Sequence, residues 1–265
     1  MRYGLVIPQN RTRKNEPMKL DQWMSEFYGM PWYRLDSLDD PRLCKEEGLY
    51  ELRLLSDDFS GIIEAQKNGF SLVESFIEFE TNVEPNNDEY EGIRLMNKSD
   101  HTFISTLNEQ SMCQNEGYRT RFNNPLYFDE SACRKYYGAA ITNNINDPNV
   151  LTAVVEMGRE VVGFFMLKIN NQQTCKGLMT GVIPKARGKK LHIKMQQFLI
   201  NYIGHPFTLI NTTQLSNFAV IKNHIRSRRS LSKIEHIFYK KVQVRTLLQL
   251  LIFDQGLKKE YSDIL

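Results

Sequence analysis

The segment Val182-Ile-Pro-Lys-Ala-Arg-Gly-Lys-Lys-Leu-His192 combines features of an anion-binding loop. Its first residues predict a strand that Pro184 stops, and a helix is expected from about residue 188. The N-terminus of a helix leaves backbone N–H groups free to bind an anion, and Arg187, Lys189 and Lys190 would add charge-assisted contacts. A pyrophosphate group fits such a loop. Taken alone, so short a segment is more often a solvated basic turn.

The remaining reactive residue types form weaker patterns. The four cysteines lie far apart, without a Cys-x-x-Cys pair or a histidine at ligand spacing, which argues against a metal site. We expect them to be reduced and mostly structural: Cys44, Cys113, Cys133 and Cys175. Three histidines have no sequence context that marks a role: His101, His205 and His236. No spacing singles out one acid among Glu26, Asp129 and Glu156.

The composition predicts a globular protein with a sizeable core. The chain has 265 residues, of which 41% are hydrophobic and 25% charged, and this length suits one large domain or two small ones. The net charge of +3 is spread over the sequence, so no basic stripe predicts a nucleic-acid partner. The apolar runs at 5–8 and 247–253 are too short for a signal-peptide core or a membrane span. We therefore expect a cytoplasmic protein without a membrane partner.

The second half of the chain has a regular order of elements. Two β-branched runs, 151–156 and 161–169, flank the turn Met157-Gly158-Arg159-Glu160 and predict a hairpin. Helices are expected before it at 100–112 and 129–144. After it we expect a strand at 176–183, a helix at 188–202, a strand at 207–211, a helix at 217–226 and a strand at 234–240.

A polar run at 81–89 predicts a linker between two domains. The order strand, polar cap, helix, strand occurs before it at 50–80 and again at 207–240, which indicates a weak internal repeat. Aligning Phe59 with Phe218 places Asp58 opposite Asn217 and Ala65 opposite His224. We expect an N-terminal scaffold or substrate domain at 1–84, a catalytic domain at 92–240 and a helical tail at 241–265 that could pack on a neighbouring copy.

The order of hairpin, strand, basic loop and helix resembles the GNAT superfamily of acyl-CoA N-acyltransferases. In that family the loop reads Arg or Gln, two residues, Gly, one residue, then Gly or Ala. The chain has Arg187 and Gly188, whereas Lys190 and His192 stand where the motif has its two small residues. The resemblance implies an α/β (α+β) fold of two GNAT-like domains with a mixed central sheet, the first one partial.

The resemblance also implies roles for individual residues. The acyl-CoA would be bound by the strand end and the loop: Thr180, Val182, Ile183, Arg187, Gly188, Lys189, Lys190 and Leu191. GNAT enzymes commonly place a tyrosine seven residues after an asparagine, and here His224 follows Asn217 at that spacing. These two residues are therefore the expected catalytic pair, with His224 giving a proton to the departing thiolate. An ordinary surface histidine on a helix is the alternative. No metal is implied.

Three blocks resemble two-domain GNAT enzymes that acylate dTDP-linked amino sugars, such as dTDP-fucosamine acetyltransferase. They are Trp23–Gly29, Gln66–Glu74 and Tyr118–Phe122. This resemblance implies a dTDP-amino sugar as acceptor, an acyl-CoA as donor and a homodimer. The aromatic residues Trp23, Phe27, Tyr28, Trp32 and Tyr33 could stack on a thymine or sugar, although such clusters more often form a core.

Two alternatives remain open. The first is a GNAT enzyme that acylates another small amine or a protein N-terminus. The second is a non-catalytic binding protein that has kept the fold, which the side chains at Lys190 and His192 favour because they could crowd a pyrophosphate.

Overall fold

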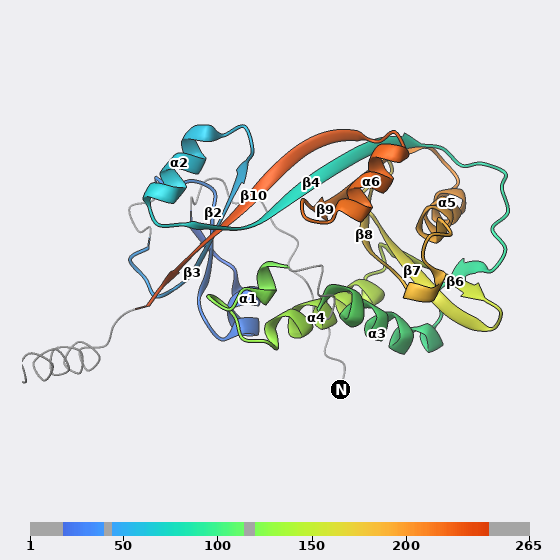
Figure 1. Ribbon diagram of the computed structural model, residues 1–265, viewed down its shortest axis with the longest axis horizontal. Coiled ribbons are helices and arrows are strands. Elements are labelled where there is room, and N and C mark those ends of the chain that lie inside the picture. The colour runs from blue at the N-terminus through green and yellow to red at the C-terminus, as the bar shows by residue number, and fades with distance from the viewer. Residues whose placement is uncertain (1–17, 40–43, 114–119, 244–265) are drawn as a thin grey trace, which may run out of the picture. The chain divides into compact units, whose positions relative to one another are not determined.

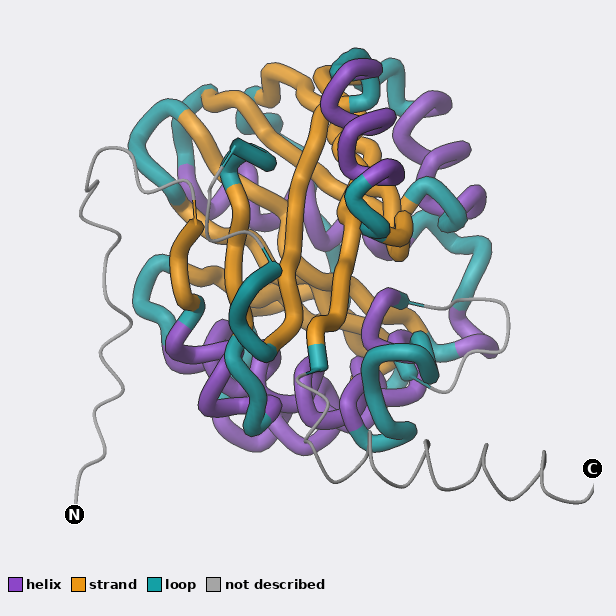
Figure 2. The backbone as a smooth tube through the Cα atoms, turned by 90° about the vertical axis from the view of Figure 1, so that its left-hand side faces the viewer, coloured by secondary structure: helices purple, strands orange, loops and turns teal. Residues whose placement is uncertain are grey.

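A computed structural model describes residues 18–39, 44–113 and 120–243 of the chain. It divides the chain into two compact units. Of the described residues, the first unit contains 18–39, 44–54, 58–71 and 238–243, and the second contains 55–57, 72–113 and 120–237. Of the expected helical tail at 241–265, residues 244–265 lie outside the described residues. Figure 2 shows that both strands and helices contribute throughout, as the α/β prediction requires.

The second unit is built on a mixed sheet. Its strand order is β10-β4-β9-β8-β7-β6-β5. The bounds are β4 Ser71–Val83, β5 Ile93–Leu95, β6 Val150–Met157, β7 Glu160–Ile169, β8 Thr174–Val182, β9 Phe207–Gln214 and β10 Ser230–Val242. β4 to β9, β5 to β6, β6 to β7 and β7 to β8 are antiparallel, whereas β8 and β9 run parallel. The predicted hairpin is confirmed as β6 and β7.

Helices cover both faces of this sheet (Figure 1). On one face, α3 (His101–Met112) and α4 (Ala132–Asn146) pack against alternate side chains of the central strands, including Val154 and Phe164. On the other face, α5 (Leu191–Ile203) packs against the intervening residues, including Ala153 and Val155. The two-residue periodicity of the strands therefore directs neighbouring residues into separate cores.

The first unit has its own small core. β1 (Met18–Leu20) pairs antiparallel with β2 (Trp32–Leu35), and β2 pairs parallel with β3 (Gly48–Leu55). Its helices are α1 (Gln22–Tyr28) and α2 (Phe59–Lys67). Trp32 and Tyr50 are fully buried, and Trp32 also packs edge-on against Tyr239. The aromatic cluster considered for ligand stacking is therefore largely core: Tyr28 stacks on Trp32, and only Trp23 of these residues is markedly exposed.

The predicted internal repeat is confirmed in detail. Asp58 caps α2 and Asn217 caps α6 (Phe218–Arg226), each through a side-chain oxygen that accepts the N–H three residues later. Both helices have nine residues. Ala65 and His224 occupy the same position in these two helices, and both are buried. The helical position that carries His224 is thus an inward-facing one in both copies.

The compact units do not follow the boundary at the polar run. The predicted linker does contain a segment without regular structure, at 84–90. However, residues 72–83 of β4 belong to the second unit, because they pair with β9 from Phe76–Gln214 to Val83–Phe207. The end of β10 belongs in turn to the first unit, where Phe238 joins the core. Long-range strand pairing, which local composition does not encode, determines this division.

Candidate active site

The sheet of the second unit opens between β8 and β9. These parallel strands pair from Thr174–Thr208 to Gly177–Asn211, and no pairing continues beyond Asn211 although β8 extends to Val182 and β9 to Gln214. The diverging strand ends leave backbone N–H and C=O groups available for a ligand. At the point of divergence, the buried Asn211 side chain has an Nδ2 group with no hydrogen-bond partner among the described residues.

A bulge in β8 lies directly beside this opening. Phe165 pairs with Thr180 and Leu167 pairs with Gly177, so two steps along β7 match three along β8. The extra residue lies at Leu178–Met179 and changes the direction of the strand edge that faces β9. Thr180 also anchors the strand, because its hydroxyl donates to the Phe164 carbonyl at 2.9 Å.

The predicted basic loop connects β8 to α5. Arg187 is exposed, and its Nε donates to the Val182 carbonyl at 3.0 Å, which keeps the guanidinium close to the strand end. Gly188 has φ +82°, and Lys189 is exposed. Leu191 is the first residue of α5 and is buried in the core, so it can offer only its backbone N–H to a ligand. The loop therefore presents free helix N–H groups next to positive side chains.

The two positions that depart from the glycine-containing motif have different environments. Lys190 has φ 57°, a left-handed conformation that glycine adopts without strain and that other residues rarely adopt. Its backbone thus retains the shape that a glycine would favour, and its side chain is exposed. His192 lies within the first turn of α5, where burial and the charge of Arg229 lower its pKa.

The predicted catalytic pair lies on α6. Asn217 is the N-cap of this helix, and its Oδ1 accepts the Val220 N–H, so its side chain has a structural role in the described state. His224 is 6% exposed, and its ring centroid lies 4.7 Å from that of Phe79 on β4. Phe79 pairs with Asn211, which places His224 next to the point where β8 and β9 diverge.

The environment of His224 changes its expected chemistry. Burial, followed by the charges of Arg229 and His192, lowers the pKa of His224 to about 4. The imidazole is therefore neutral at neutral pH and keeps one N–H to donate. A positively charged imidazolium as the proton donor to the departing thiolate is therefore disfavoured, because desolvation and two basic neighbours all oppose the charged form of the ring.

Two site residues were not singled out in the sequence. The Nη2 of Arg229 donates to Oε1 of Gln196 on α5 at 2.7 Å, while its Nη1 is buried without a hydrogen-bond partner among the described residues. Burial lowers the pKa of Arg229 to about 10. Gln196 lies four residues after His192 on one helix, which is a recognisable signal that the two share a face. Nothing in the local sequence of Arg229 indicates that it is partly buried.

The opposite face of the opening carries a buried ion pair. Nη1 of Arg121 donates to Oε2 of Glu74 at 2.9 Å, and both side chains are less than a tenth exposed. Glu74 lies on β4, two residues before Phe76, and the guanidinium of Arg121 lies over the rings of Phe76 and Phe122. Desolvation raises the pKa of Glu74, and the Arg121 charge opposes that rise.

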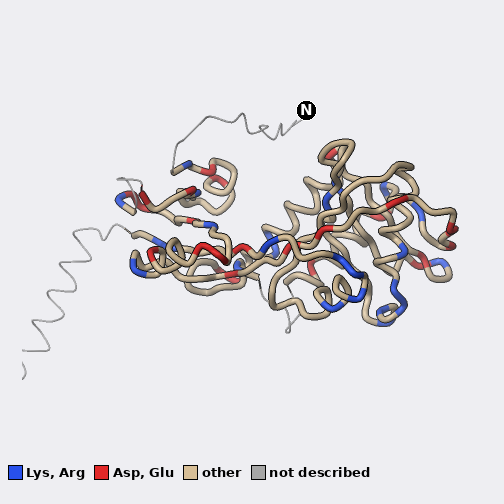
Figure 3. The backbone as a smooth tube through the Cα atoms, turned by 90° about the horizontal axis from the view of Figure 1, so that it is seen from above, with Lys and Arg blue, Asp and Glu red and all other residues tan. Residues whose placement is uncertain are grey.

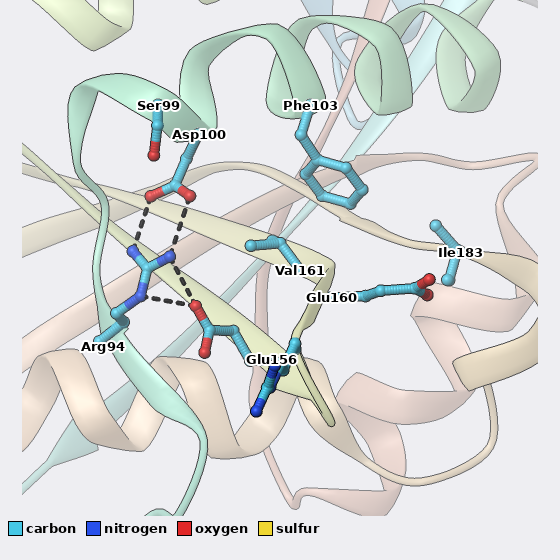
Figure 4. Close-up of a pocket in the computed structure, with 9 residues that line it drawn as sticks. Arg94, Ser99, Asp100, Phe103, Glu156, Glu160, Val161 and Ile183 are labelled. Atoms are coloured by element: carbon cyan, nitrogen blue, oxygen red, sulfur yellow. Dashed lines mark hydrogen bonds and ion pairs between the residues drawn. The ribbon is translucent and has the colours of Figure 1, made fainter.

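A cavity of about 610 Å³ lies between the start of α3 and the β6–β7 turn, and Ile183, just after β8, is one of its lining residues. Figure 4 shows that Arg94 projects between two acids there. Its Nη1 and Nη2 bind both oxygens of Asp100 at 2.7 and 3.0 Å, and Nη2 lies 2.7 Å from Glu156. Because these charges satisfy one another, we interpret this network as a connection between β5, α3 and β6 rather than a catalytic group.

The remaining predicted acids and cysteines have mainly structural contacts. Asp129 accepts hydrogen bonds from Ser131, and Glu26 accepts one from Gln22. The thiol of Cys133 lies 2.9 Å from that of Cys113, and Cys175 is buried in the core around α5. No group of three or more potential metal ligands occurs among the described residues. No helix in the described ranges is long and apolar enough to cross a membrane.

Figure 3 shows acidic and basic residues along much of the described chain, but the stretch 161–234, which contains the basic loop, has twelve Lys and Arg and no Asp or Glu. The basic loop before α5 therefore lies in a part of the chain whose only formally charged side chains are positive.

Comparisons with known proteins identify the fold. No family model and no curated protein sequence matches the chain. Among solved structures, a conserved protein of unknown function from Staphylococcus epidermidis matches with a TM-score of 0.58 and 10% identity, over 90% of this chain and 96% of that one. A tandem GNAT protein from the clavulanic acid biosynthesis pathway matches with a TM-score of 0.53 and 11% identity, over 82% and 77%.

A GCN5-related N-acetyltransferase from Sphaerobacter thermophilus matches with a TM-score of 0.50 and 12% identity. That match covers 76% of this chain and 62% of the other. At these identities the similarity establishes the fold and not the activity. The chain has the mixed α/β fold of the GNAT acetyltransferases, which confirms the fold class predicted from the sequence.

Proposed function

We propose that this protein is an acyl-CoA-dependent N-acyltransferase. The observation that carries the proposal is the opening between β8 and β9 after Gly177 and Asn211, next to a bulged strand that leads into a basic loop and a helix N-terminus. The loop offers N–H groups and positive charge to the CoA phosphates. The free edge of β8 offers N–H groups to the thioester carbonyl, whose oxygen becomes negative when an amine attacks.

In this proposal the donor lies on the face of the sheet that carries α5 and α6. Backbone groups of Thr180, Val182 and Ile183 bind the pantetheine arm and the thioester, and residues Arg187 to Leu191 bind the phosphates. His224 lies beside the sulfur and donates a hydrogen bond from its neutral ring, and Asn217 positions it by capping α6. The amine approaches from the face with Glu74 and Arg121 and loses its proton to water.

For the acceptor we propose the amine of a dTDP-linked amino-dideoxy sugar, acylated by a cytoplasmic homodimer. This finer proposal rests on the three sequence blocks that resemble enzymes of that kind. Another small amine or a protein N-terminus would use the same donor site and a different acceptor pocket.

A mass-spectrometric screen tests the proposal. The full chain is incubated with acetyl-CoA and longer acyl-CoAs against amino-sugar nucleotides, free amino acids and N-terminal peptides. The expected result is a new amide together with free CoA for one pairing. Absence of transfer together with no rise in melting temperature on adding CoA would contradict the proposal and favour the non-catalytic alternative suggested by Lys190 and His192.

A further inference from the structure

Three basic side chains converge on the face of the sheet where α5 and α6 lie. His192 comes from α5, His224 from α6, and Arg229 from the turn between α6 and β10. Arg229 is tied to α5 through Gln196 and to α6 through its own N–H, which donates to the His224 carbonyl at 3.2 Å. The backbone of Arg229 is therefore held by α6, and its guanidinium is held by α5.

This basic cluster has no acidic counterpart among the described residues. The charges that act on His224 are those of Arg229 and His192, and the charge that acts on His192 is that of Arg229. The partner of Arg229 is the neutral amide of Gln196, and its buried Nη1 has no acceptor in the described part of the chain. Burying a cation without a counterion is unfavourable, so the site is suited to receive an anion.

The location of the cluster limits which anion it can receive. The ring of His224 packs on Phe79, which pairs with Asn211 at the point where β8 and β9 diverge. Asn211 contributes a second buried donor without a partner, Nδ2. Hence two buried donors without partners, Nη1 of Arg229 and Nδ2 of Asn211, belong to residues that His224 and Phe79 connect at the end of the opening.

We propose that Arg229 is a catalytic residue that stabilises the departing sulfur of CoA as a thiolate. This inference rests on the proposed function. The C–N bond forms, the C–S bond breaks with its electron pair on sulfur, and the proton of the amine passes to water. The guanidinium holds the sulfur anion until solvent protonates it after release. A charged side chain in a water-poor site stabilises a developing negative charge more strongly than water does.

The ionisation of bound CoA tests this role independently of turnover. The thiolate of CoA absorbs in the ultraviolet, so the thiol pKa is measured in the complex by titration, with the same titration of the desulfo-CoA complex subtracted. In the wild type we expect a value about 1 to 3 units below that of the thiol of free CoA, as for a group close to an opposite charge. Arg229→Gln should return the value to that of free CoA.

Two further variants make the test specific. Gln196→Glu keeps the guanidinium but gives it a carboxylate partner, and should therefore abolish most of the shift. Arg226→Gln removes an exposed arginine at the end of α6 and should leave the shift unchanged. Circular dichroism and melting temperature establish that each variant is folded, and Arg229→Lys should retain part of the shift if the charge is responsible.

The outcomes separate this inference from the function on which it depends. If CoA binds the wild type with an unshifted thiol, or with the same shift in Arg229→Gln, the inference is wrong and the proposed function stands. If Arg229→Gln weakens CoA binding but leaves the thiol pKa unchanged, Arg229 holds a phosphate instead and the inference is likewise wrong. If the wild type binds no CoA, both the proposed function and the inference fail.

Discussion

Gly177 on β8 faces Asn211 on β9, and this pair is the last one before the two strands diverge. A methyl group at residue 177 would clash with the side-chain oxygen of Asn211 and would come within 3.4 Å of the Phe165 ring. The absence of a side chain at Gly177 therefore allows the Asn211 amide to lie over β8.

Replacing Gly177 with alanine should destabilise the protein and displace the Asn211 amide. We expect a loss of about 1–3 kcal/mol in the free energy of unfolding, as for other overpacked sites, together with weaker CoA binding. Urea denaturation and calorimetry measure these effects. Gly138→Ala is the control, because residue 138 lies in α4 with nothing within 4 Å of the added methyl group, and it should be neutral or stabilising. Equal behaviour of the two variants would contradict the role of Gly177.

The basic loop should determine affinity for the donor and not for the acceptor. Removing both Arg187 and Lys189 by alanine substitution should raise the KM for acyl-CoA about ten- to hundredfold, a range reduced for solvent exposure of these side chains. Steady-state kinetics with each substrate varied in turn measures the effect. Lys194→Ala, an exposed lysine of α5, serves as the control. An equal rise in both KM values would show that the loop does not bind the donor.

Lys190 should be replaceable by glycine without loss of the loop conformation. The left-handed backbone at this position destabilises a residue that has a Cβ atom by about 1–2 kcal/mol. Glycine removes this strain but makes the unfolded chain more flexible, and we expect the removal of strain to be the larger effect, so that Lys190→Gly stabilises the loop. Lys190→Ala removes the same charge and retains the backbone strain. A melting temperature that is higher for glycine than for alanine is the expected result. The opposite order would mean that the lysine stem contributes more than the backbone.

The value of kcat should not change with pH over the range in which an ordinary histidine titrates. Because the pKa of His224 is lowered to about 4, its ring is protonated only below that pH and stays neutral from about pH 5 to 8. His224→Phe keeps the ring on Phe79 but removes one hydrogen-bond donor, and kcat should fall about tenfold. A fall of about 10²–10⁴-fold, with a wild-type rate that declines through about pH 6.5, would instead establish His224 as an imidazolium acid.

The Arg94–Asp100 pair should make stability depend on pH in the acid range. Hydrogen bonds from Arg94 lower the pKa of Asp100 in the folded protein. The contribution of Asp100 to the free energy of unfolding is therefore fully present above its unfolded-state pKa of about 3.9, and it is lost as pH falls through the lower folded-state pKa. Asp100→Asn should cost about 1.5–3 kcal/mol at neutral pH and flatten the acid side of the stability profile. Chemical denaturation across the acid range measures both.

The matched control for that prediction is Glu160→Gln. Glu160 pairs with Lys185 on the surface, where both side chains are about 70% exposed, and its removal should change stability little at any pH. If the two variants lose the same stability, the Arg94–Asp100 pair is no more important than a surface ion pair.

Much of the second unit could be predicted from local sequence because its signals act over a few residues. The β6–β7 hairpin follows from β-branched runs around a glycine turn, and α6 begins at the cap residue Asn217. The repeat of α2 and α6 was visible for the same reason: Asp58 and Asn217 provide the same cap. Small elements without a strong period were not predicted, including β1, β2 and β5.

By itself the sequence determined the order of elements, the basic loop and the position of His224 on a capped helix, since capping, turn chemistry and hydrophobic period depend on neighbours in the chain. Only the tertiary structure decided that β4 pairs with β9, that β8 and β9 separate after Asn211, and that Arg229 meets Gln196 and His224. These features depend on strand register and on burial, which bring together residues far apart in the sequence. For the same reason the low pKa of His224 could not be inferred from its residue type alone.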